Sequence, residues 1–196
     1  RPAAAAAAAA GEVETFEVEL ATAERVRVAK RPGLDEFLAA LAAEADLEVA
    51  VFTAAQQVYA DPVLDRLDPA RGVLRRRYYR GHCALQRGLY VKDLRAVSRD
   101  LARTVLVDNN PASFLAQPLN GLPVASWYGD DPRDRGLAGA LEVLRLLKGH
   151  VDVQTSLQRT FQLDRALGAY RDHVYGNGPA AAAAAAGGAV GGPIIP

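Results

Sequence analysis

The stretch Arg103–Phe114, RTVLVDNNPASF, decides the fold class. Its aliphatic run at 105–107 predicts a short strand that is buried on both faces. The strand ends abruptly in the polar run DNNP at 108–111. Because ligands bind beyond the carboxyl ends of the strands in open parallel sheets, a metal ion or a phosphate group could be held there. An Asx turn that simply leaves a core strand would use the same residues, so both interpretations stay open.

A second apolar run, Leu47–Phe52, also ends in a polar residue, Thr53, and helical spacing follows from Gln56 to Leu67. A strand followed by a helix, repeated along the chain, is typical of an α/β fold with a parallel sheet. The spacing of leucines in Arg135–Leu147 predicts a helix that lies on this sheet.

The N-terminal part of the folding unit predicts a separate hairpin. Glu12–Leu20 alternates apolar residues with acids and Arg25–Lys30 alternates valine with bases, so opposite charges would face each other across two antiparallel strands. A helix is expected after Pro32, with an apolar face between Leu34 and Leu41. We further expect short strands within 72–79, 83–91 and 123–126, and helical segments at 93–101 and 153–167.

The composition suits one folded domain with low-complexity ends. The chain has 196 residues, half of them apolar. An alanine-rich segment at 1–11 and an Ala/Gly/Pro tail at 176–196 need not pack, so the folding unit is expected at 12–175. Residue 1 is Arg and no signal-peptide pattern is present, so we expect the chain to be a fragment or an internal product.

Charge and cysteine content argue against several classes of protein. Lys plus Arg and Asp plus Glu are balanced at 23 each, so no overall basic field favours nucleic acid. The arginines between Arg71 and Arg80 form either a solvated strand face or an anion-binding rim. Cys83 is the only cysteine, which excludes an internal disulfide and favours an intracellular protein. No segment predicts a membrane span.

Five motifs together resemble a known family, the small phosphatases that act on the RNA polymerase II carboxy-terminal domain. This group includes the Dullard-type phosphatases and belongs to the haloacid-dehalogenase superfamily. The resemblance covers about Phe16–Leu167. It implies a Rossmann-like haloacid-dehalogenase fold, with a parallel sheet flanked by helices and a small β-hairpin insertion. The motifs are RPGLDEFL at 31–38, VFTA at 51–54, YADP at 59–62, YVKDL at 90–94 and VDNNPASF at 107–114.

The resemblance implies roles for individual residues. Thr53 resembles the hydroxyl residue that hydrogen-bonds a phosphoryl oxygen, and Lys92 resembles the lysine that neutralises charge on the transferred group. Asn109 is similar to a direct Mg²⁺ ligand and Asp108 to a residue that orients the metal site from outside. Arg80 resembles an arginine near the phosphopeptide groove, although a solvated strand face remains an equal alternative. The implied cofactor is therefore Mg²⁺, and the implied partner is a phosphoprotein with phosphoserine or phosphothreonine, without direct nucleic-acid contact.

The catalytic carboxylates of the family are missing from the sequence. In this superfamily the nucleophile is the first Asp of an Asp-x-Asp-x-Thr or Asp-x-Asp-x-Val motif, at the end of the first core strand. The sequence contains no such motif before the predicted hairpin, and no later Asp replaces it. We therefore expect the isolated chain to be inactive, with open edges on the two strands beside the missing one.

Three hypotheses account for this gap. In the leading one the motif lies upstream of Arg1, and the whole protein is a serine/threonine phosphatase with an aspartyl-phosphate mechanism. In the second the protein is a catalytically inactive pseudophosphatase, which acts as a phosphopeptide-binding or import-receptor-like interaction module. In the third it is a plain α/β interaction domain. The nucleus or cytoplasm is favoured over the mitochondrion as its location.

Overall fold

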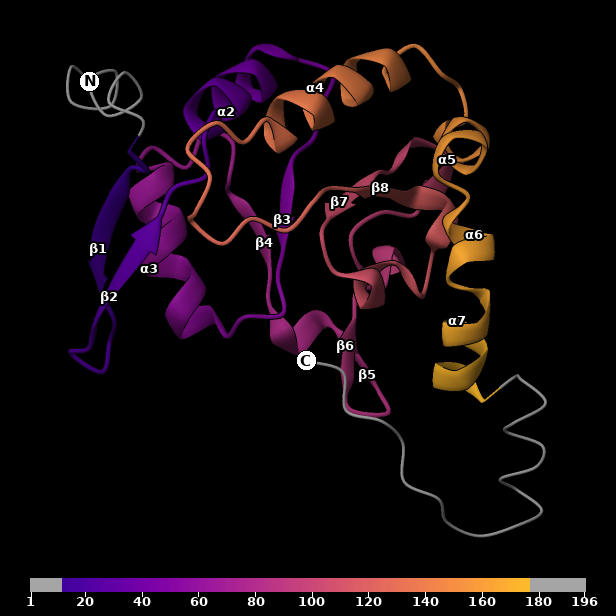
Figure 1. The fold of residues 1–196 in the computed structure, drawn as a ribbon, viewed down its shortest axis with the longest axis horizontal. Coiled ribbons are helices and arrows are strands. Elements are labelled where there is room, and N and C mark those ends of the chain that lie inside the picture. Colours follow the sequence, from indigo (N-terminus) through magenta and orange to yellow (C-terminus); the bar gives the residue numbers. More distant parts are fainter. Residues whose placement is uncertain (1–11, 177–196) are drawn as a thin grey trace, which may run out of the picture.

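The computed structural model describes residues 12–176, and Figure 1 shows their arrangement. The fold is α/β, with short parallel and antiparallel strand pairs and helices around them, so the predicted fold class is confirmed. The predicted low-complexity segment at 1–11 and the tail from 177 onward lie outside the described residues.

The predicted N-terminal hairpin is confirmed. Strand β1 (Thr15–Glu19) pairs antiparallel with β2 (Arg25–Ala29), so that acids of one strand face arginines of the other. The two ion pairs, with N–O distances of 3.8 and 3.9 Å, are mostly exposed and therefore contribute little stability. Helix α3 (Gln57–Leu67) packs against β1, which attaches the hairpin to the rest of the domain.

The parallel strands form two separate pairs. Strand β3 (Ala50–Phe52) pairs with β4 (Arg76–Tyr78), and β7 (Leu106–Asp108) pairs with β8 (Gly121–Pro123). Figure 1 shows these strands across the molecule in the order β4, β3, β7 and β8. Within residues 12–176, neither β3 nor β7 pairs with any further strand, so each has one open edge.

A second antiparallel hairpin lies within 83–91, where the sequence predicts a single short strand. Strands β5 (Ala84–Gln86) and β6 (Leu89–Val91) are joined by the two residues Arg87 and Gly88, both with positive φ. That is the geometry of a tight hairpin turn whose twist matches the flanking strands. Gly81, where the sequence suggests a turn between two strands, lies instead in a short 3₁₀ turn before β5.

Helix α2 (Leu34–Ala43) packs against α4 (Gly136–Leu147), and Figure 1 shows both above the parallel pairs. The predicted helix at 153–167 is interrupted at Gln162, which has a positive φ of 49°. The predicted helix at 93–101 is wrong: the segment forms one 3₁₀ turn, and a second begins at its last residue, because the side chains of Asp93 and Ser98 hydrogen-bond nearby backbone groups in place of a helical ladder. The remaining elements are α5 (Val153–Phe161), α6 (Leu163–Ala166), α7 (Gly168–Tyr175), η1 (Arg80–His82), η2 (Leu94–Ala96), η3 (Leu101–Arg103), η4 (Pro111–Phe114) and η5 (Pro118–Asn120).

The buried core surrounds β7 and the turn that follows it. Phe114 and Leu115 are almost completely buried, and Phe114 joins Leu94 and Leu106 in one apolar cluster. Gly121 starts β8 where a Cβ atom would lie 2.7 Å from the ring of Phe114, so only glycine allows this approach. The polar turn at the end of β7 therefore packs on a layer of tightly packed apolar side chains.

Candidate functional site: the carboxyl ends of the parallel strands

Polar residues follow β3 and end β7, as the sequence predicts. Thr53 comes directly after β3, and its backbone N–H donates to the Tyr78 carbonyl at 2.9 Å. The Thr53 hydroxyl oxygen accepts from the Ala55 backbone N–H at 3.0 Å. This bond uses the oxygen as an acceptor only, so the Thr53 O–H remains available to donate to a ligand. Asp108 is the last residue of β7.

A buried ion pair is the centre of the candidate site. Lys92 follows β6, and its Nζ donates to Oδ2 of Asp108. The two side chains are only 10% and 8% exposed. The other carboxylate oxygen of Asp108 accepts from the Asn110 backbone N–H at 2.8 Å. The sequence predicts Lys92 and Asp108 as separate site residues, and the structure brings them into direct contact.

The turn that carries Lys92 is fixed by a residue that the sequence analysis missed. The amide of Gln117 donates to Oδ1 of Asp93 and accepts from the Leu94 backbone N–H, both at 2.9 Å. No sequence pattern links Gln117 to this turn, because they are 23 and 24 residues apart and meet only in the folded chain. Gln117 thus holds the backbone immediately after Lys92.

The shifted pKa of Asp93 in this turn makes the stability of the fold depend on pH. Hydrogen bonds from Arg95 lower the pKa of Asp93 from its ordinary 3.8 to about 2. The folded state therefore binds this proton less readily than the unfolded chain, so the stabilisation is present above about pH 4 and is lost as the pH falls toward 2. Because Arg95 is largely exposed, we expect this ionised Asp93 to contribute about 1–2 kcal/mol to the free energy of unfolding at neutral pH.

Urea unfolding between pH 2 and pH 7 measures this contribution. Asp93→Asn should lower the free energy of unfolding at neutral pH and reduce its fall on acidification relative to the parent chain. Asp130→Asn is the matched control, since Asp130 is exposed in a loop and makes no hydrogen bond among the described residues. Equal acid sensitivity of the parent chain and the Asp93→Asn variant would contradict the prediction.

Cys83 lies next to the site residues. Its Sγ atom is 3.9 Å from the Thr53 carbonyl oxygen. Burial raises the pKa of the thiol, and the positive charges of Lys92 and Arg80 only partly oppose this. The thiol therefore stays protonated near neutral pH, which argues against a role for Cys83 as a nucleophile.

Arg80 lies at the rim of the site. Its Nε donates to the Ala54 carbonyl at 2.7 Å, one residue after Thr53. The guanidinium carbon lies 4.9 Å from the centre of the Tyr90 ring, a cation–π distance. The structure thus brings Arg80 beside the end of β3, and its role in peptide binding stays a prediction.

Asn109 faces a second residue that the sequence analysis missed. Its side-chain amide donates to the Ser126 hydroxyl at 3.0 Å. Sequence analysis places Ser126 inside a strand at 123–126, whereas β8 ends at Pro123 and leaves Ser126 beyond its carboxyl end. The signal that identifies Thr53, a polar residue after a parallel strand, would have identified Ser126 with the correct strand boundary.

The described residues do not complete a Mg²⁺ site by themselves. No group of three or more His, Cys, Asp or Glu that could hold a metal ion occurs within 12–176. Both carboxylate oxygens of Asp108 already accept hydrogen bonds, one of them from Lys92. The Asn109 amide oxygen makes no hydrogen bond within this range, but a single oxygen ligand is not enough for Mg²⁺.

The described helices include none that is both long enough and apolar enough to cross a membrane.

Comparison with known proteins gives a consistent result. The family model described as NLI interacting factor-like phosphatase matches residues 5–154. The chain is 42% identical over 141 residues to CTD nuclear envelope phosphatase 1 of Xenopus tropicalis, a match that covers 72% of this chain and 57% of that protein. It is 46% identical over 136 residues to carboxy-terminal domain RNA polymerase II polypeptide A small phosphatase 2 of Mus musculus, covering 69% of this chain and 49% of that protein.

Among solved structures, that of Fcp1, an essential RNA polymerase II CTD phosphatase, aligns with a TM-score of 0.46 and 20% identity, over 74% of this chain and 42% of that one. The chain spans about half the length of the curated relatives that it matches. The family model covers most of the chain and includes every predicted site residue. The chain therefore belongs to the NLI interacting factor-like phosphatase family.

Proposed function

We propose that this chain is the larger part of a protein serine/threonine phosphatase domain, which works through an aspartyl-phosphate and Mg²⁺. The observation that carries the proposal is the buried Lys92–Asp108 pair at the point where β7 ends, close to Thr53 and Arg80. Phosphoryl transfer spreads negative charge over three oxygens, so a fixed lysine and hydrogen-bond donors are what such a site requires.

Each residue of the site has a distinct proposed task. Lys92 neutralises charge on the transferred phosphoryl group, and Asp108 holds its ammonium in place. Only one of the three ammonium hydrogens is used by Asp108, so the other two remain for phosphoryl oxygens. Thr53 donates its free O–H to the same group. Arg80, at the rim, contacts the phosphopeptide.

The nucleophile would come from a strand that is not among the 196 residues. The hydrogen bond from Thr53 N–H to Tyr78 fixes the register of β3 on β4, and backbone groups alternate in direction along a strand. The N–H and C=O groups of Phe52 therefore point away from β4. By the same reasoning, the bond from Val124 N–H to the Asp108 carbonyl leaves the groups of Val107 pointing away from β8. Such open edges are ready to pair with a further strand, which supports the proposal.

An added strand between β3 and β7 that runs parallel to them would place its carboxyl end beside Thr53 and Asp108. A carboxylate there could attack phosphorus, while the seryl or threonyl oxygen leaves with a proton from a second carboxylic acid; water then hydrolyses the aspartyl-phosphate. In the complete protein Asn109 would be the Mg²⁺ ligand that this chain contributes, and the ion would neutralise phosphate charge.

The relatives guide the proposal for substrate and location. Two of them are named for the RNA polymerase II carboxy-terminal domain or the nuclear envelope. We propose a phosphoserine- or phosphothreonine-containing protein as the substrate, and a nuclear or nuclear-envelope setting.

A second candidate function is phosphopeptide binding without hydrolysis. It is favoured by one observation: the 196 residues include the candidate phosphate-binding side chains but no Asp-x-Asp-x-Thr or Asp-x-Asp-x-Val motif. A pseudophosphatase would retain Lys92, Thr53 and Arg80 and bind a phosphopeptide without turnover.

Phosphate release from a phosphoserine peptide with Mg²⁺ distinguishes the two functions. We expect no phosphate release from the 196-residue chain, and phosphate release from the full-length gene product. Phosphate release from the 196-residue chain that is abolished by Asn109→Ala would contradict the proposal that the nucleophile lies on a strand not among these residues. Phosphopeptide binding without release by the full-length product would replace the phosphatase proposal with the binding function.

A further inference from the structure

The side chain of Arg80 is held between two parts of the chain that lead to the candidate site. On one side, its backbone N–H donates to the Ala55 carbonyl at 3.0 Å and its Nε to the Ala54 carbonyl at 2.7 Å. Both carbonyls belong to the segment that directly follows Thr53. On the other side, its guanidinium carbon lies 4.9 Å from the centre of the Tyr90 ring. The guanidinium at the rim of the site therefore has a defined position.

Tyr90 lies on the strand that leads into Lys92. It is the middle residue of β6, two positions before Lys92. Val91 between them is completely buried, whereas 36% of Tyr90 is exposed, as the alternation of side chains along a strand requires. Burial raises the pKa of the Cys83 thiol, and the positive charges of Lys92 and Arg80 both act to lower it, so the two cations lie near the same thiol. Strand β6 therefore connects the ring beside Arg80 to the lysine of the buried ion pair.

The guanidinium of Arg80 keeps donors for a ligand. A guanidinium has five N–H donors in one plane, and Nε donates to Ala54. The two amino groups form no hydrogen bond and no ion pair within residues 12–176. Their planar fork matches two oxygens of a phosphoryl group. Because an arginine that is already ordered loses less side-chain entropy on binding, a fixed fork binds more tightly than a mobile one.

We infer that Tyr90 is a positioning residue for Arg80: its ring holds the guanidinium in the orientation in which the two amino groups bind the phosphoryl group of a phosphoserine peptide. This role rests on the proposed function, which supplies the ligand of Arg80. Tyr90 acts through Arg80 and not by its own contact with the substrate. A ring that bound the peptide directly would contribute independently of Arg80, so a double-variant cycle distinguishes the two roles.

Steady-state kinetics of the full-length gene product on a phosphoserine peptide tests this role. Tyr90→Leu should raise KM by about two- to fivefold, the range of a cation–π contact at an exposed site, and leave kcat unchanged. Tyr90→Phe keeps the face of the ring and should keep the parent KM. Leu85→Ala is the control for the hairpin, because Leu85 is the cross-strand partner of Tyr90 and is 61% exposed. A parent-like KM for Tyr90→Leu, or an equal rise for Leu85→Ala, would overturn the inference.

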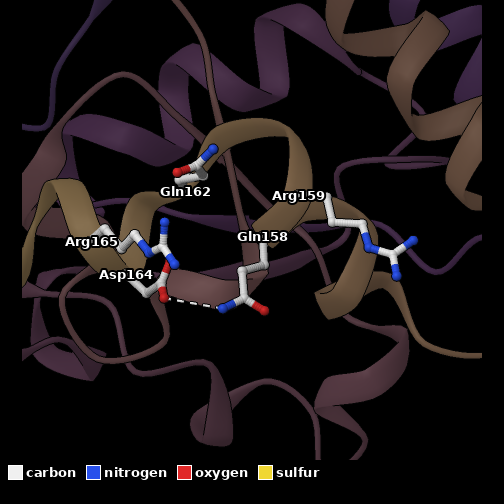
Figure 2. Close-up of a pocket in the computed structure, with 5 residues that line it drawn as sticks. All are labelled: Gln158, Arg159, Gln162, Asp164 and Arg165. Carbon is white, nitrogen blue, oxygen red and sulfur yellow. Dashed lines mark hydrogen bonds between the residues drawn. The ribbon is translucent and has the colours of Figure 1, made fainter.

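A cycle with Arg80→Gln decides whether Tyr90 acts through Arg80. Arg80→Gln alone should raise KM by at least about tenfold, because it removes charge-assisted hydrogen bonds to the phosphoryl group. Adding Tyr90→Leu should raise KM no further, since no guanidinium remains to be held. Arg159→Gln is the charge control and should keep the parent KM: Figure 2 shows Arg159 on α5, where it lines a cavity of about 290 Å³ outside the candidate site. Additive effects of Arg80→Gln and Tyr90→Leu would overturn the inference.

Failure of the proposed function gives a different result from failure of this role. If the full-length product binds the peptide without releasing phosphate, dissociation constants replace KM and the same ratios are expected. A product that neither hydrolyses nor binds the phosphoserine peptide would contradict the proposed function, and the role of Tyr90 with it. An active product whose KM does not respond to Tyr90→Leu would contradict the role of Tyr90 alone. Circular dichroism of every variant ensures that only folded protein is compared.

Discussion

We expect Asp108→Asn to lower the free energy of unfolding of the chain by about 3–5 kcal/mol, because it leaves the Lys92 ammonium buried without its counter-ion. Lys92 and Asp108 are each about nine-tenths buried, so water cannot replace the lost partner. The amide is nearly the same size as the carboxylate and can still accept from Asn110 N–H, so the change removes charge without creating a cavity.

The double variant Lys92→Met with Asp108→Asn is the control for this prediction. Removing both charges should restore most of the lost stability, because an apolar side chain of similar length can occupy the same space without desolvated charge. Urea unfolding of the parent, the single and the double variant gives the three free energies. If the free energy of unfolding of Asp108→Asn lies within about 0.5 kcal/mol of the parent value, water screens the ion pair, and the prediction from its burial is contradicted.

Local periodicity was enough to predict the elements that depend on local packing. The hairpin at β1 and β2 follows from alternating charge, and α2 and α4 follow from helical spacing of leucines. The segment after Lys92 has the same spacing but no helix, because Asp93 and Ser98 cap short turns. Periodicity indicates which face of a helix would be apolar. It does not indicate whether polar side chains form hydrogen bonds with backbone groups that a helix would need for its own hydrogen bonds.

The site was predictable residue by residue but not as an arrangement. Thr53 and Asp108 are visible because a polar residue ends an apolar run, and Lys92 is visible through the family motif. Sequence patterns do not identify their neighbours Gln117 and Ser126, because these residues contact the site from other elements through long-range hydrogen bonds. The division of the parallel strands into two pairs likewise depends on long-range pairing, which no short window of sequence contains.

In a catalytically complete protein, Lys92→Gln should reduce the turnover number by about 10²–10³-fold, because the site loses the charge that stabilises the transferred phosphoryl group. The loss should appear mainly in kcat, since charge on the phosphoryl oxygens has to be stabilised most in the transition state. Steady-state kinetics on a phosphoserine peptide gives both constants. Lys148→Gln is the matched control, because Lys148 pairs with Glu44 at the exposed end of α4, far along the chain from the site.

Stability and catalysis have to be separated in this experiment, because Lys92→Gln also leaves Asp108 without its counter-ion. Rates are therefore compared below the unfolding transition of the weaker variant, where both proteins are folded. Two ammonium hydrogens of Lys92 are not used by Asp108, and these are the donors that a phosphoryl group would engage. An unchanged kcat in folded Lys92→Gln protein would mean that those donors never meet the substrate, and that the ion pair serves only to fix the turn after β6.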